Sequence, residues 1–164
     1  MKIQVNSQRG FSLVEAMVAM VVLSIGMLGI AALYVESLRS GTSALLRSQA
    51  VAFASDMADR IRANPTAGAS YTKAIDAVGT VTAACTSTGT GTCTVAQMAA
   101  TDIAQWTQQL DDRSDNPGLG RQGLPAGRGI IDVAAGPPAI YTITVQWTES
   151  GQTAASNYVL RVQL

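Results

Sequence analysis

Hydrophobic residues are concentrated near the start of the chain, where about twenty uncharged and mostly apolar residues run from Ala16 to Val35. A helix of that length crosses a hydrocarbon layer of about 30 Å. Lys2 and Arg9 precede the run, and no acidic residue occurs before Glu15. The positive-inside rule therefore predicts one transmembrane span with its N-terminus in the cytoplasm and the rest of the chain outside.

The pattern stays helical beyond this run. Apolar residues recur at three- and four-residue spacing as far as Arg62, with most charges on other faces, and Asn64-Pro65 is the first strong helix breaker. A single helix from Phe11 to about Asn64 would be roughly 80 Å long at 1.5 Å per residue. The apolar positions of its second part are Leu38, Leu46, Ala50, Phe53, Met57 and Ile61.

Residues 66–94 are rich in Thr, Ala, Gly and Ser, and this composition predicts an irregular connection with a short helix near residues 72–77. Thr94-Val95-Ala96-Gln97 then has the spacing of a capping box. The apolar stripe from Val95 to Leu110 predicts a helix, with Trp106 as a core or interface anchor. The hydrophobic anchors expected in the connection are Tyr71, Ile75 and Val78.

The last part of the chain changes to a two-residue period. Apolar and polar residues alternate over residues 141–147 and 158–164, and Gly129–Ala134 is a candidate for an earlier strand. Ser150-Gly151 marks a turn between the last two strands. We expect an antiparallel sheet whose apolar face is covered by the second half of the long helix, so the predicted fold class is α+β.

The composition of the chain disfavours several classes of function. Eleven Lys and Arg residues balance eleven Asp and Glu residues, so no basic surface for direct nucleic-acid binding is expected. The chain has no histidine, which removes the commonest general base and most zinc sites. We therefore expect no enzyme activity, no catalytic residues, no cofactor and no metal. A calcium loop is the alternative to a solvated loop at Asp111, Asp112 and Asp115, although no EF-hand pattern is present.

The two cysteines, Cys85 and Cys93, enclose a run of Thr, Ser and Gly. Outside the cytoplasm, a disulfide is the natural inference for such a pair. In the chain-entropy model, closing so small a loop stabilises the fold by roughly 2.5 kcal/mol. The spacing is not CxxC, and two thiols without histidine make a poor metal site.

The front edge of the apolar run carries a specific motif. Residues 9–15 read Arg-Gly-Phe-Ser-Leu-Val-Glu, which resembles the type III signal of type IV prepilins. That resemblance implies cleavage between Gly10 and Phe11 by prepilin peptidase and N-methylation of the new Phe11 amine. It also implies that Glu15 pairs with such an amine when a subunit docks into the filament. The alternatives are a glutamate that lies at the headgroup level, and an ordinary signal peptide cut near residues 29–31.

A second stretch, in the later part of the predicted helix, carries a more specific resemblance. Residues 46–50, Leu-Arg-Ser-Gln-Ala, and the run DMADRIRANP at residues 56–65 resemble the corresponding region of PilV-type minor pilins, also described as type IV pilus modification proteins. The resemblance implies a pilin-like fold and a part in assembling, initiating or modifying type IV pili, which serve cell adhesion, twitching motility and DNA uptake. It implies as partners the other major and minor pilins, prepilin peptidase, the pilus assembly machinery and inner-membrane lipid.

The expected organisation has four parts. Residues 1–10 form a prepilin leader, 11–35 the transmembrane and filament-core helix, 36–64 its amphipathic continuation, and 65–164 a periplasmic α+β domain. The expected location is the bacterial inner membrane as a single-pass protein, and then the pilus fibre. Three other functions stay open: a pseudopilin of type II secretion, which shares leader and helix; a tip adhesin that binds through its loops; and a membrane-anchored enzyme.

Overall fold

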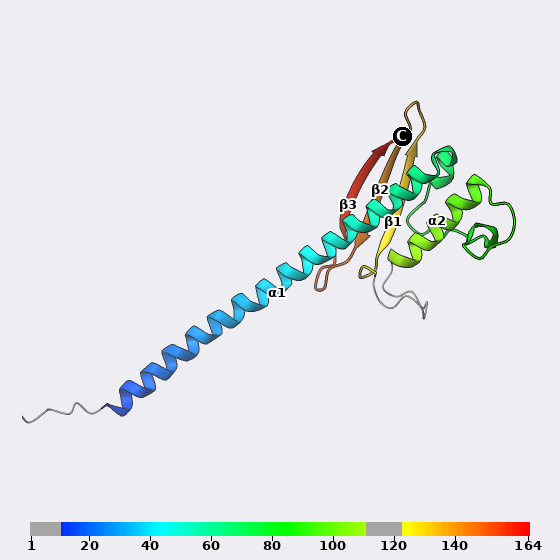
Figure 1. The fold of residues 1–164 in the computed structure, drawn as a ribbon. Coiled ribbons are helices and arrows are strands. Elements are labelled where there is room, and N and C mark those ends of the chain that lie inside the picture. The colour runs from blue at the N-terminus through cyan, green and yellow to red at the C-terminus, as the bar shows by residue number, and fades with distance from the viewer. Residues whose placement is uncertain (1–10, 111–122) are drawn as a thin grey trace, which may run out of the picture. The chain divides into compact units, whose positions relative to one another are not determined.

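The computed structural model describes residues 11–110 and 123–164, which form the α+β fold expected from the sequence (Figure 1). The chain divides into two compact units, one that ends at Thr42 and one that spans Ser43–Leu164. The elements in chain order are α1 (Leu13–Ala63), the 3-10 helices η1 (Pro65–Tyr71) and η2 (Ala83–Cys85), α2 (Val95–Leu110), β1 (Arg128–Ala134), β2 (Ile140–Trp147) and β3 (Ser156–Gln163).

The first unit contains the N-terminal part of α1. No side chain between Phe11 and Thr42 is buried, and the large apolar side chains there are exposed by 49% at Val35 up to 77% at Phe11. Among the described residues, α1 is the one helix that is long and apolar enough to cross a membrane. So much exposed apolar surface is stable only against lipid or other apolar helices.

The second unit contains the rest of α1, which turns one apolar face to the core. Five residues on this face have no exposed surface: Ala50, Ala54, Met57, Ala58 and Ile61. Three of these five residues are alanines. Leu46 and Phe53 pack at the margin of the same core. The predicted stripe is thus confirmed from Leu46 to Ile61 and wrong for Leu38, which belongs to the first unit and is exposed.

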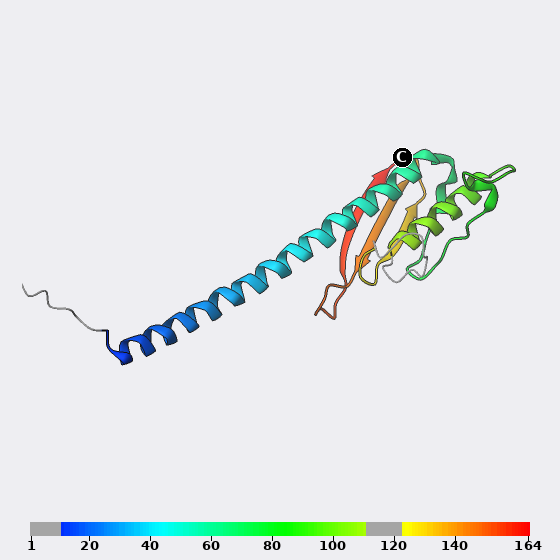
Figure 2. The same cartoon turned by 60° about the horizontal axis from the view of Figure 1, so that its bottom comes forward.

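The sheet is antiparallel, with the strand order β1-β2-β3. Its register places Ile143 between Ile131 and Leu160, and Gly151, whose φ is 84°, occupies the turn between β2 and β3. Both α1 and α2 pack on one face of the sheet (Figure 2). That inner face supplies the buried residues Ile131, Tyr141, Ile143, Val145, Trp147 and Val162. The predicted covering of the sheet by the second half of the long helix is confirmed.

The helix α2 begins and packs as its sequence predicts. The Thr94 hydroxyl accepts a hydrogen bond from the Gln97 backbone N–H at 3.3 Å, and the Gln97 side chain accepts one from the Thr94 N–H at 3.0 Å. This reciprocal pair is the predicted capping box. Trp106 is fully buried, and its indole N–H donates to the Phe53 carbonyl of α1 at 2.9 Å. The bond fixes α2 against α1 within the second unit.

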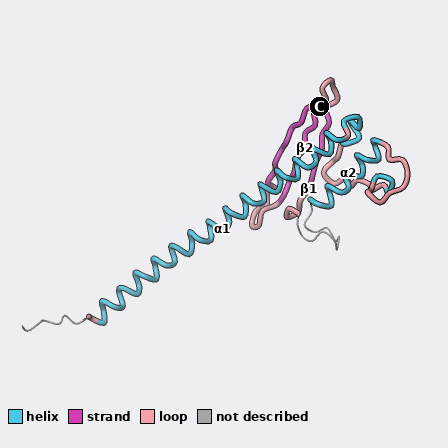
Figure 3. Tube along the Cα trace, viewed as in Figure 1, coloured by secondary structure: helices cyan, strands magenta, loops and turns pink. Residues whose placement is uncertain are grey.

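The connection between α1 and α2 is mostly irregular, as expected, but its helical parts differ from the prediction (Figure 3). The 3-10 helix η1 occupies Pro65–Tyr71, whereas residues 72–77 are not helical. Instead, Lys73 pairs with Ile131 through two backbone hydrogen bonds of 2.9 and 3.0 Å, so this part of the connection lies along β1. Tyr71 is buried as expected, but Val78 is 73% exposed and is not the anchor that was predicted.

Candidate processing and assembly site

The helix α1 starts immediately after the predicted processing site. Phe11 precedes the helix and is exposed, whereas Gly10 lies outside the described residues. The Ser12 carbonyl accepts a hydrogen bond from the Ala16 N–H at 3.2 Å, which places Ser12 at the N-cap. The structure therefore puts Phe11 one residue before the cap and within reach of solvent.

Glu15 lies in the first turn of α1 and is exposed. A carboxylate there is favoured by the positive end of the helix dipole. Ser12 and Glu15 also have the Ser-x-x-Glu spacing of a capping box. Glu15 is the sole charged residue from Phe11 to Val35. A lone carboxylate among apolar side chains gains most from a neighbouring cation once water is excluded.

The predicted disulfide between Cys85 and Cys93 is present, with the two Cα atoms 5.1 Å apart. The 3-10 helix η2 ends at Cys85, and Cys93 directly precedes the N-cap residue Thr94 of α2. The bond thus anchors the Thr- and Gly-rich loop to the start of α2, and both cysteines are half-buried.

A polar cluster within the second unit was not predicted. The hydroxyl of Tyr71 donates to the Asp102 carboxylate at 2.7 Å. Arg60 contacts the same carboxylate at 3.3 Å, the Gln105 side chain at 3.1 Å and Asp56 at 3.0 Å. Burial, followed by the adjacent Asp102 carboxylate, raises the pKa of the Tyr71 hydroxyl above its ordinary range. The sequence contains the i,i+4 pair of Asp56 and Arg60, but no local signal connects it to Tyr71 or Asp102.

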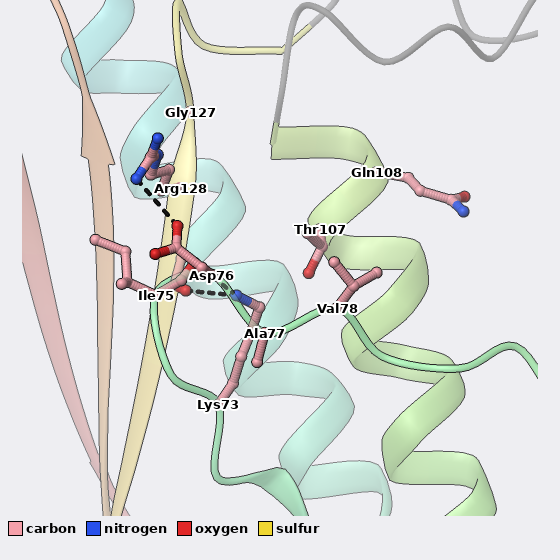
Figure 4. Close-up of a pocket in the computed structure, with 10 residues that line it drawn as sticks. Lys73, Ile75, Asp76, Ala77, Val78, Thr107, Gln108, Gly127 and Arg128 are labelled. Atoms are coloured by element: carbon pink, nitrogen blue, oxygen red, sulfur yellow. Dashed lines mark hydrogen bonds and ion pairs between the residues drawn. The ribbon is translucent and has the colours of Figure 1, made fainter.

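A shallow cavity of about 290 Å³ lies between β1, α2 and residues 73–78 (Figure 4). Lys73 is buried there, and its ammonium group donates to the carbonyls of Gly129 at 2.7 Å, Ala74 at 3.1 Å and Ile75 at 3.4 Å. Burial lowers the pKa of Lys73, and the nearby Asp76 carboxylate opposes that shift. Because three carbonyls occupy the donors of the ammonium group, this lysine fastens the connection to β1.

The structure provides no further site chemistry in the residues that it describes. Over residues 11–110 and 123–164, no three His, Cys, Asp or Glu side chains come together in a way that would hold a metal ion. The acidic residues weighed as a calcium loop, Asp111, Asp112 and Asp115, lie outside the described residues.

Two protein-family models match parts of the chain. Residues 5–31 match the prokaryotic N-terminal methylation motif, which includes both sides of the predicted cleavage point and Glu15. Residues 32–104 match the family described as type IV pilin Tt1218, from the end of the apolar run into α2. No curated protein and no solved structure matches the chain.

The N-terminal methylation motif, the apolar helix and the small α+β unit are together similar to the features of a type IV pilin. Within that class, the second match supports a type IV pilin of the Tt1218-like kind. Proteins of this family are structural subunits. The family also implies interaction with other pilins and with prepilin peptidase.

Proposed function

We propose that the chain is a minor pilin of the PilV type, which is processed by prepilin peptidase between Gly10 and Phe11 and is incorporated into type IV pili. The new Phe11 amine is methylated, and the Glu15 carboxylate pairs with such an amine when a subunit joins the filament. The subunit then acts in pilus assembly, initiation or modification.

One observation carries this proposal. The part of α1 from Leu13 to Thr42 has large apolar side chains on all its faces, and none of them is buried within the chain. Such a helix first needs lipid and afterwards needs other helices like itself. Cleavage before Phe11 would leave this helix in the mature protein, which suits assembly through the helix.

The proposal assigns a role to each part of the chain. Residues 1–10 are the leader, 11–35 the transmembrane and filament-core segment, 36–64 its amphipathic continuation, and 65–164 the periplasmic domain. Lys2 and Arg9 favour a cytoplasmic N-terminus. The disulfide between Cys85 and Cys93 supports a periplasmic location for the second unit, because disulfides persist in oxidising compartments.

The PilV-type assignment rests on the run DMADRIRANP, at the C-terminal end of α1. Three of its residues carry local structure that a filament subunit needs. Met57 and Ile61 fill the core of the second unit, and Arg60 joins α1 to α2 through Asp102. The run therefore packs the C-terminal part of α1 into the core of the second unit. This packing is the same whichever filament the subunit enters.

Mass spectrometry of the mature chain tests the processing step. We expect an N-terminus at Phe11 that carries one methyl group, and we expect an unprocessed chain in cells that lack prepilin peptidase. An intact Met1 in wild-type cells, or an N-terminus near Ala32, would contradict the proposal.

Deletion of the gene tests the pilus assignment. We expect loss or alteration of surface pili with protein secretion intact, and recovery when the gene is restored. The opposite result, normal pili with defective secretion of folded proteins, would make the chain a pseudopilin of type II secretion. Both results are compatible with a methylated Phe11. The deletion therefore tests the pilus assignment, and the mass spectrum tests the processing step, independently of each other.

A further inference from the structure

The face of the sheet opposite the helices has no cover from the described part of the chain. We call it the outer sheet face. All of its residues are exposed or half-buried. It consists of Arg128, Ile130, Asp132 and Ala134 of β1, Ile140, Thr142, Thr144 and Gln146 of β2, and Asn157, Val159, Arg161 and Gln163 of β3.

The strand register arranges these residues in four rows that cross the sheet. One row is charged at both ends, with Asp132 on β1, Thr142 on β2 and Arg161 on β3. Asp132 and Arg161 stand two strand spacings apart, at about 4.8 Å each, so they are not direct neighbours within the chain. Asp132 and Arg161 are both exposed.

The next row is apolar at both ends. Ile130 on β1 and Val159 on β3 flank Thr144 on β2, and Val159 is 47% exposed. The two end rows are Arg128–Gln146–Asn157 and Ala134–Ile140–Gln163. Val159 is exposed and Ile130 is half-buried, so a partner surface that covers this row needs apolar groups at both edges to match them.

We propose that the outer sheet face pairs with the same face of a second copy of the chain, about a two-fold axis that runs along β2. This rotation puts β1 of each copy over β3 of the other. Asp132 then faces Arg161 of the second copy, and Ile130 faces Val159 of the second copy, each contact occurring twice. Thr144 and Ile140 lie near the axis and face their own equivalents. A symmetric interface requires such self-complementarity.

Other arrangements match less well. A two-fold axis across the strands would lay the charged row over the apolar row and leave Asp132 against Ile130. An anionic partner such as nucleic acid would meet Asp132 between the two arginines, and Arg128 already pairs with Asp76 at 3.0 Å. The second copy is the occupant whose charges and apolar groups both match.

The size of the face sets the strength of the pairing. Three strands about 4.8 Å apart and four rows about 7 Å apart give a surface of only a few hundred Å² per copy. Interfaces of that size are weak and transient in solution. Anchoring both copies in one membrane raises their effective concentration and favours pairing there. The pairing uses residues of the second unit alone, so it does not depend on processing at Phe11.

Cross-linking of the full chain in membranes tests the symmetry. Thr144→Cys places a single free thiol near the axis, because no other free cysteine occurs among the described residues. Facing sheets lie about 10 Å apart, so a thiol-specific linker of about 10 Å should join two copies. The control is Thr66→Cys, an exposed threonine of η1. We expect a homodimer for Thr144→Cys and none for Thr66→Cys; equal yields would overturn the proposal.

Charge reversal then tests the facing pairs. In the Thr144→Cys background, Asp132→Arg or Arg161→Asp alone should lower the dimer yield by roughly fivefold, since each puts like charges opposite each other at two places. A mixture of the two variants with different tags should recover the yield as mixed dimers only. The double variant in one chain should pair with itself.

The mixed experiment separates pairing from folding. Both substitutions are at exposed positions, and the mixture contains the same chains that fail to pair alone, so recovery cannot come from better folding. Resistance of each variant to protease confirms its fold. No recovery in the mixture, or cross-linking of Thr144→Cys mainly to another protein, would overturn the proposal.

Discussion

At the residue scale, Glu15 has a proposed role in docking and a position that suits helix capping, and these two roles have different chemical requirements. Its position three residues after the N-cap Ser12 suits a capping box, which a neutral glutamine also satisfies. Pairing with the methylated amine requires negative charge. The two roles can therefore be separated by comparing glutamine with alanine at this position.

We expect Glu15→Gln and Glu15→Ala to insert into the membrane and to be cleaved as the wild type is, but to enter pili at least about tenfold less. Loss of the charge is the shared cause, since it leaves the amine without a counter-charge where water is excluded. Glu15→Asp keeps the charge and should retain partial incorporation. Quantitative blotting of sheared pili and of membranes measures the ratio. Normal incorporation of Glu15→Gln would show that the charge is not needed.

Tyr71 is a second residue whose ionisation state matters to the fold. Its hydroxyl donates to the Asp102 carboxylate at 2.7 Å in a buried site. In the unfolded chain this phenol ionises near pH 10, whereas in the fold its pKa is raised. The folded chain therefore holds one more proton above about pH 10, and stability falls as the pH rises through that range.

We expect Tyr71→Phe to lower the free energy of unfolding by about 1.5–3 kcal/mol at neutral pH, because the half-buried Asp102 carboxylate loses its shorter hydrogen bond and keeps only the Arg60 contact at 3.3 Å. The difference between variant and wild type should shrink above about pH 10. Urea melts at several pH values measure it. Lys73 has a lowered pKa and acts in the opposite direction, but it is common to both proteins and cancels in the comparison. The control is Tyr158→Phe, a half-buried tyrosine of β3.

At the element scale, the contact between α2 and β1 depends on a residue without a side chain. Gly129 lies on the inner face of β1, where a Cβ atom would overlap the indole ring of Trp106 and approach Leu110. The missing side chain makes room for a fully buried Trp106, whose N–H then reaches the Phe53 carbonyl. Close helix–sheet packing thus follows from one glycine opposite one tryptophan.

We expect Gly129→Ala to lower the free energy of unfolding by about 1–3 kcal/mol, the usual cost of an extra methyl group in a packed core. Gly136→Ala is the matched control, because its nearest contact would be an ordinary 3.6 Å from the Pro138 carbonyl. Thermal melts and tryptophan fluorescence, to which Trp106 and Trp147 both contribute, check both variants. An unchanged melt for Gly129→Ala would show that α2 can move away from β1 without cost.

The same elements show how far the sequence predicts the fold. Hydrophobic periodicity and helix-capping residues are local features of the sequence. For this reason the ends of α1, α2 and the three strands could be predicted to within one or two residues, and the capping box at Thr94 could be predicted as well. The part played by Lys73 could not, because its three carbonyl partners include Gly129, which is 56 residues away. A lysine in an irregular, polar stretch gives no sign of burial. Val78 shows the converse: an apolar residue that the fold leaves exposed.

The candidate site was predictable in a different way. Gly10, Phe11 and Glu15 lie in a stretch that matches the N-terminal methylation motif, so a linear pattern suffices to propose them. The polar cluster of Tyr71, Arg60 and Asp102 needs the tertiary fold, because it joins η1, α1 and α2. A linear processing motif can thus be proposed from the sequence alone, whereas the residues that hold the second unit together become visible only in the structure.

At the scale of the whole molecule, the chain divides its tasks between two units with opposite relations to solvent. The unit that ends at Thr42 buries no side chain of its own over residues 11–42, whereas Ser43–Leu164 contains the whole hydrophobic core. The helix α1 runs through both units, so its exposed apolar part and its buried part belong to one continuous helix. Stability of the second unit and association of the first should therefore respond to different substitutions.

A chain that begins at Thr42 tests this division. None of the described residues that it lacks, 11–41, has a buried side chain, and Thr42 supplies a favourable N-cap for the remaining part of α1. We expect it to be soluble without detergent and to unfold with a free energy within about 1 kcal/mol of that of the full chain in detergent, as is usual when only exposed residues change. The full chain should stay with membranes after an alkaline wash, and the shortened chain should not sediment with them. If the shortened chain were unfolded by circular dichroism, the first 41 residues would contribute to the core, and the two units could not be treated as independent.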